Sequence, residues 1–112
     1  MQDIFIEDEG NGTPLVLVHG FLGSSEMWTL QTDFFKRNFR VIAPALPGFG
    51  KSNKVKSSNS IEDMAKSILA SLEKKKIERF YLLGHSMGGM IVQEMVKLAG
   101  EKILKLICYG TG

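Results

Sequence analysis

The feature that most constrains the fold is the pentapeptide Gly84-His85-Ser86-Met87-Gly88, which joins two segments of different pattern. It follows the apolar run Phe80 to Leu83, typical of a buried strand, and opens a stretch of helical periodicity from Met87 to Leu98. A G-x-S-x-G sequence at such a junction predicts a sharp turn that lifts the serine off the sheet, with glycines on both sides leaving room for it. Ser86 is therefore a candidate nucleophile. An ordinary Gly/Ser turn is the alternative interpretation.

The rest of the chain alternates strand and helix patterns. The expected strands are Ile4–Ile6, Leu15–Val18, Arg40–Ala43, Phe80–Leu83 and Leu104–Tyr109, with a turn at Glu9–Gly12. Helices are expected over Ser25–Phe35, after Ser60, and over Met87–Leu98, with Gly100 as the last C-cap. This alternation predicts an α/β fold, a doubly wound three-layer sandwich around a mostly parallel sheet.

The helix that begins at Ser60 has the clearest sequence signals. Asp63 stands three residues after Ser60, as in a capping box, and lysines close the segment, as the helix dipole prefers. Its apolar positions fall on one face and are Ile61, Met64, Ala65, Ile68, Leu69 and Leu72.

Composition narrows the class of protein. The 112 residues allow one domain, and 44% apolar with 23% charged residues is typical of a soluble globular chain. The net charge of +2 comes mainly from short lysine clusters without interleaved aromatics, which indicates a solvated surface and no nucleic-acid site. Cys108, the single cysteine, lies in an apolar run, which predicts a core residue. One cysteine cannot form an internal disulfide, which is consistent with a reducing compartment. Because no leader or membrane-spanning run is recognised, we expect a cytoplasmic protein without membrane contact.

Two further motifs accompany the serine turn. His19-Gly20-Phe21 ends an expected strand, and the loop Pro44 to Ser52 contains Pro-Gly-Phe-Gly-Lys-Ser. With these motifs, nearly all of the chain resembles the N-terminal half of an α/β-hydrolase of the serine esterase or lactonase type. The resemblance implies that Ser86 is the nucleophile and that the backbone N–H groups of Phe21 and Met87 form the oxyanion hole.

The resemblance also implies residues that bind substrate. The sequence departs from the family pattern at one position. Leu22, a further candidate for the oxyanion hole, and Trp28 are expected to bind substrate, although a Trp on an amphipathic helix is more often a core residue. Ala45 stands where the family usually has a structural aspartate, which weakens the loop but removes no catalytic group.

The triad is incomplete. The family order is serine, then acid, then histidine. After Ser86 the only acids are Glu94 and Glu101, and both histidines, His19 and His85, precede the serine. We therefore interpret residues 1–112 as a single partial domain that lacks the lid and the C-terminal strands.

The expected function is hydrolysis of a small ester, lactone or related carbonyl substrate through an acyl-enzyme, with the chain by itself inactive. No cofactor and no metal are implied. A non-catalytic small-molecule receptor of the same fold is an alternative. A phosphate loop at Ala45 to Ser52 is a remote one, because no helix follows that loop directly.

The last expected strand would have an unpaired edge. We therefore expect self-association, or pairing with a missing C-terminal half, that buries Leu106, Cys108 and Tyr109.

Overall fold

A computed structural model of the chain describes residues 4–19, 33–45, 60–85 and 87–109. Their strands form one five-stranded sheet in the order β1-β3-β2-β4-β5. The strands are β1 (Ile6–Glu9), β2 (Thr13–Val18), β3 (Phe39–Pro44), β4 (Phe80–His85) and β5 (Ile103–Tyr109). β1 runs antiparallel to β3, and the other three pairings are parallel, which confirms a mostly parallel sheet.

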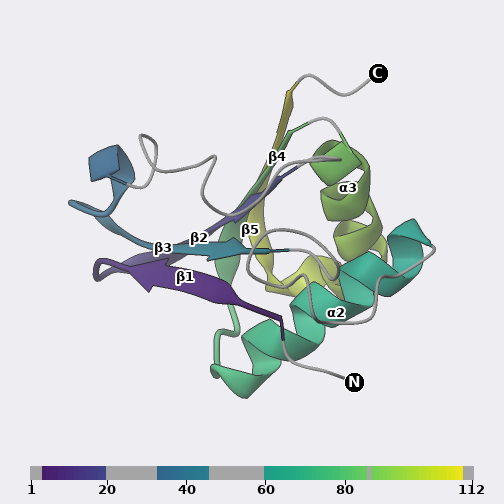
Figure 1. Cartoon of the computed structure of the whole chain (residues 1–112), viewed down its shortest axis with the longest axis horizontal. Coiled ribbons are helices and arrows are strands. Elements are labelled where there is room, and N and C mark those ends of the chain that lie inside the picture. The colour runs from purple at the N-terminus through teal and green to yellow at the C-terminus, as the bar shows by residue number, and fades with distance from the viewer. Residues whose placement is uncertain (1–3, 20–32, 46–59, 86, 110–112) are drawn as a thin grey trace.

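Two helices cover one face of this sheet. α2 (Ile61–Lys74) and α3 (Met87–Ala99) contact each other and lie together on one side of the strands (Figure 1). The main core lies beneath them, where Val16, Val18, Ile42, Phe80 and Leu82 of the sheet meet apolar residues of both helices. The predicted apolar face of α2 is confirmed, since Met64, Ala65, Ile68 and Leu72 are buried and Ile61 and Leu69 pack beside them.

Local capping fixes both ends of α2. The Ser60 hydroxyl accepts a hydrogen bond from the Asp63 backbone N–H at 3.0 Å, as the sequence predicts. At the other end Lys76 adopts φ 61°, and the Ile77 N–H donates to the Leu72 carbonyl at 3.0 Å. This arrangement closes the helix with a left-handed residue and directs the buried Ile77 back into the core.

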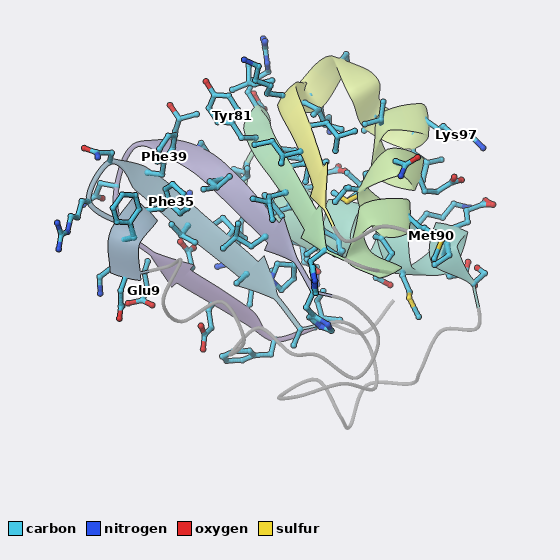
Figure 2. The ribbon with its side chains drawn as sticks, turned by 90° about the horizontal axis from the view of Figure 1, so that it is seen from above. Glu9, Phe35, Phe39, Tyr81, Met90 and Lys97 are labelled. Atoms are coloured by element: carbon cyan, nitrogen blue, oxygen red, sulfur yellow. The ribbon has the colours of Figure 1, made fainter. Side chains whose placement is uncertain are left out.

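The opposite face of the sheet carries a smaller apolar cluster. Leu15, Leu17, Val41 and Ala43 are buried there, and aromatic rings pack beside them. Phe35, Phe39 and Tyr81 follow one another in edge-to-face contact, with ring centroids 6.2 and 6.0 Å apart. Figure 2 shows these three rings far from Met90 and Lys97 of α3.

A charged network holds β1 in place. Arg40 donates two hydrogen bonds to the Asp8 carboxylate, at 2.9 and 2.7 Å, and Lys75 reaches the same group at 3.1 Å. The hydrogen bonds from Arg40 lower the pKa of Asp8 from its ordinary value, and Lys75 adds to the effect. The network therefore ties β1 both to β3 and to the end of α2.

One local expectation is wrong and one holds in part. α3 ends at Ala99, so Gly100 directly follows the helix as expected of a C-cap, but it has no left-handed φ and begins a 3₁₀ turn, Gly100–Lys102, that leads into β5. β1 begins at Ile6 rather than Ile4, because its pairing partners on β3 start opposite Ile6. Of the helix expected over 25–35, only residues 33–35 are described, and they are helical. The side chains of Cys108 and Tyr109 lie outside the described set, so their predicted burial stays a prediction.

No helix in the described ranges is both long and apolar enough to cross a bilayer.

Candidate functional site

The candidate site is built at the carboxyl ends of the parallel strands. β2 ends at Val18, opposite Gly84 of β4, and β4 continues to His85, opposite Tyr109 of β5. Parallel strands bring their carboxyl ends to one edge of a sheet, where α/β proteins place their ligands. The ends of β2 and β4, and that of the parallel strand β3, therefore lie at one edge of the sheet.

Gly84 is required by its contact with the start of α3. A Cβ built on Gly84 would lie 2.5 Å from the Gly88 carbonyl oxygen and 2.8 Å from a Val92 methyl carbon. Those separations are too short for any side chain, and the first involves backbone. β4 and α3 can thus approach closely only because this position carries no side chain.

Gly88, at the start of α3, lies against the backbone at the end of β2. A Cβ there would collide with the Val18 carbonyl oxygen and would lie 2.7 Å from the His19 carbonyl oxygen. The sequence predicts that both glycines leave room for the serine side chain. In the structure, they are needed because backbone from β2, β4 and α3 meets at one point.

The turn between β4 and α3 therefore has the strand-to-helix form predicted for it. β4 ends at His85, and α3 begins at Met87 with only one residue between them. The first N–H groups of a helix have no acceptor inside it and form its positive end. The backbone N–H of Met87 is one of these groups. Its role as an oxyanion donor stays a prediction.

Several predicted site residues lie outside the described residues. These are Ser86 itself, Phe21, Leu22 and Trp28. Their roles stay predictions. Most of the Ala45 to Ser52 loop also lies outside, although α2 begins only at Ile61, as the argument against a phosphate loop expects.

His19 and Ala45 are both fully buried at the ends of their strands. The Ala45 N–H donates to the Phe5 carbonyl at 2.8 Å, so the backbone of β1 holds the beginning of the loop. An apolar side chain at position 45 needs no buried hydrogen-bond partner. The departure from the family's aspartate is thus accommodated at Ala45.

The two acids that follow Ser86 in the sequence lie in α3 and in the 3₁₀ turn after it. Glu94 pairs with Lys97 one turn along α3, with 3.5 Å between nitrogen and oxygen. Glu101 is exposed in the 3₁₀ turn after the helix. Across the described ranges no group of three or more His, Cys, Asp or Glu side chains is arranged to hold a metal ion.

Comparison with known proteins agrees with this geometry. Residues 13–111 match the alpha/beta hydrolase fold family. The chain is 38% identical over 95 residues to the dihydrolipoyllysine-residue acetyltransferase component of an acetoin cleaving system from Pseudomonas putida, covering 85% of this chain and 26% of that protein.

Solved structures give the same result. A thermophilic esterase from Thermogutta terrifontis superposes with a TM-score of 0.92 at 32% identity, covering 97% of this chain and 40% of the esterase. An enzyme described as degrading N-acyl homoserine lactones superposes with a TM-score of 0.91 at 28% identity, covering 97% and 42%.

The chain belongs to the α/β-hydrolase fold family, as the resemblance predicted. It spans between about a quarter and two fifths of the length of these relatives. The relatives include esterases, lactonases and other hydrolases.

Proposed function

We propose that this chain carries the nucleophile half of a serine hydrolase that acts on a small ester or lactone. The observation that supports the proposal most strongly is the backbone contact of Gly84 with Gly88, and of Gly88 with the end of β2, on either side of Ser86. Such contacts hold the strand and helix in the arrangement that exposes a nucleophile.

In the proposed reaction the Ser86 hydroxyl oxygen attacks the carbonyl carbon while its proton passes to a base. The negative charge on the carbonyl oxygen is stabilised by the N–H groups of Met87 and Phe21. The bond to the alcohol then breaks and the alcohol leaves with a proton. Water attacks the acyl-enzyme and releases the carboxylic acid, which regenerates the serine.

The base and the acid that orients it would come from outside these 112 residues. No histidine follows Ser86 in the sequence, and Glu94 is paired with Lys97. A serine without a neighbouring base is a weak nucleophile. The isolated chain is therefore expected to have at most trace esterase activity.

A small-molecule receptor of the same fold is the second candidate. A receptor needs a pocket and no base, so its function would not depend on the Ser86 hydroxyl.

Labelling with a fluorophosphonate separates the two candidates. The proposal predicts slow covalent labelling that disappears in Ser86→Ala and persists in Ser67→Ala, where the removed hydroxyl is buried in α2. Absence of labelling in the folded chain would favour the receptor. Hydrolysis of p-nitrophenyl acetate should be at most trace, because the base and the acid are absent. A small residual rate that depends on Ser86 fits the proposal, since in serine proteases roughly 10³–10⁴-fold over water survives the loss of a triad member. Robust turnover dependent on Ser86 would contradict the missing-base argument and make His19 a candidate base.

A further inference from the structure

The turn between β1 and β2 crosses the beginning of β3, because β3 lies between those two strands in the sheet. Thr13, the first residue of β2, is opposite Phe39, the first residue of β3. Only residues 10–12 connect the two outer strands, and they must span about 10 Å, twice the spacing of neighbouring strands. The turn therefore has little spare length and lies against the backbone that leads into β3.

Gly12 is required by that crossing. It adopts φ 121°, a backbone conformation that residues with a side chain rarely take. A Cβ built on it would lie 2.8 Å from the Asn38 carbonyl oxygen, which is too short for a carbon atom. The fold therefore fixes glycine as the residue that follows Asn11.

Asn11 is under no such constraint. Among the described residues other than glycine, only Lys76 has a positive φ, so Asn11 has an ordinary backbone conformation. Asn11 and Gly12 are both exposed to solvent. The pair thus places a side-chain carboxamide that solvent reaches next to a backbone nitrogen that no side chain shields.

These two residues hold the atoms of a cyclisation that makes asparagine a thermolabile residue. The Gly12 nitrogen gives up its proton to water or hydroxide and attacks the side-chain carbonyl carbon of Asn11. A new C–N bond closes a five-membered succinimide, and the carboxamide nitrogen takes up a proton and leaves as ammonia. Water then opens the ring at either carbonyl carbon. One opening gives aspartate, and the other gives isoaspartate, in which the main chain runs through the former side chain.

We propose that Asn11 is a site of spontaneous deamidation and that its isoaspartyl product loosens β1 from β3. Isoaspartate adds one carbon atom to the main chain of the turn. The carbonyl groups of Lys36 and Asn38 leave no room for added length, since they already lie within 2.7 and 2.8 Å of where a Cβ on Gly10 or Gly12 would stand. β1 is the strand that yields, because it is an edge strand and pairs only with β3 among the described strands. Neither step involves Ser86.

Peptide mapping by mass spectrometry tests the modification. The folded chain and the matched variant Asn11→Gln are incubated at neutral and at mildly alkaline pH. A protein L-isoaspartyl methyltransferase with labelled S-adenosylmethionine then detects isoaspartate. Deamidation should be about tenfold faster at Asn11 than at Asn38, whose following nitrogen is crowded by the Phe39 side chain, and it should accelerate at the higher pH.

The variant Asn11→Gln should carry no isoaspartyl label at position 11, because its longer side chain disfavours closure of the ring. Equal rates at Asn11 and Asn38, or the same label at position 11 in the variant, would overturn the proposed site.

Hydrogen exchange tests the structural consequence. The isoaspartyl form is isolated by chromatography and compared with the unmodified chain and with Asn11→Asp. Amides of β1 should exchange about tenfold faster in the isoaspartyl form, while those of α3 should be unchanged. Asn11→Asp carries the same new charge on a main chain of normal length, so its β1 amides should exchange as in the unmodified chain. Equal acceleration in both modified forms, or none in the isoaspartyl form, would overturn the proposed loosening.

Discussion

The two edges of the sheet differ in the side chains they expose. β1 reads Ile-Glu-Asp-Glu, and its carboxylates pair with Arg40, Lys75 and Lys36. β5 carries one lysine among apolar residues, and two of these are exposed. Charged residues on an edge strand prevent pairing with another chain, whereas an apolar edge invites it. Among the described strands, the β1 edge is therefore protected by charge and the β5 edge is not.

The largest effect is expected at Gly88, where α3 meets β2 in the middle of the sheet, between the two edges. Gly88→Ala should lower the free energy of unfolding by about 3 kcal/mol, because the new Cβ would displace the backbone of Val18 and His19. Gly100→Ala is the control, since its Cβ would meet nothing closer than 3.9 Å. It should change stability by less than about 1 kcal/mol. Urea unfolding measures both, and equal effects would show that the close approach at Gly88 is relieved without cost.

A smaller effect is expected at the β1 edge. Asp8→Asn should cost about 1 kcal/mol at pH 7, because a neutral amide replaces a partly exposed carboxylate that accepts two hydrogen bonds from Arg40. The folded pKa of Asp8 is lowered, so its contribution is complete above the ordinary value of 3.8 and is lost as pH falls below it toward the folded value.

The measurement for Asp8 is unfolding free energy against pH. The wild-type chain should lose its advantage over Asp8→Asn as the pH falls below about 4. A constant difference down to pH 2 would mean that the carboxylate does not hold β1.

The smallest effect is expected at the β5 edge. Ile107→Lys should change the unfolding free energy by less than about 0.5 kcal/mol at low protein concentration, because the side chain is half exposed and a lysine stem can cover the same surface. Thermal unfolding of the two chains checks this. A loss above 2 kcal/mol would show that Ile107 belongs to the core of the isolated chain.

Local signals in the sequence predicted the centre of the molecule. The apolar run of β4 and the Ser60 cap each act over a few residues, and the structure places both as expected. The glycines around Ser86 are also in the predicted turn, but Gly88 is needed because it meets the backbone of β2. The predicted start of β1 is wrong, because long-range pairing decides it. The start of β1 depends on pairing with β3, and the helix after residue 99 tightens into the turn that leads to β5.

Two features had no local signal. The Asp8 network joins residues separated by 32 and 67 positions. A hollow of about 220 Å³ beside Tyr81 gathers side chains from four strands and from Phe35. The sequence pattern assigns the apolar residues of this hollow to separate strands and a helix. Only the order of strands in the sheet shows that Tyr81 lies beside both Phe39 and β5.

Sedimentation velocity of matched edge variants tests the central claim most directly. Each edge receives one lysine, as Ile107→Lys on β5 or Glu7→Lys on β1, and both are compared with the wild-type chain at low micromolar concentration. The account predicts that the wild-type chain self-associates, that Ile107→Lys shifts it toward monomer, and that Glu7→Lys does not. A monomeric wild-type chain, or an equal shift from both lysines, would contradict an edge that is open at β5 and closed at β1.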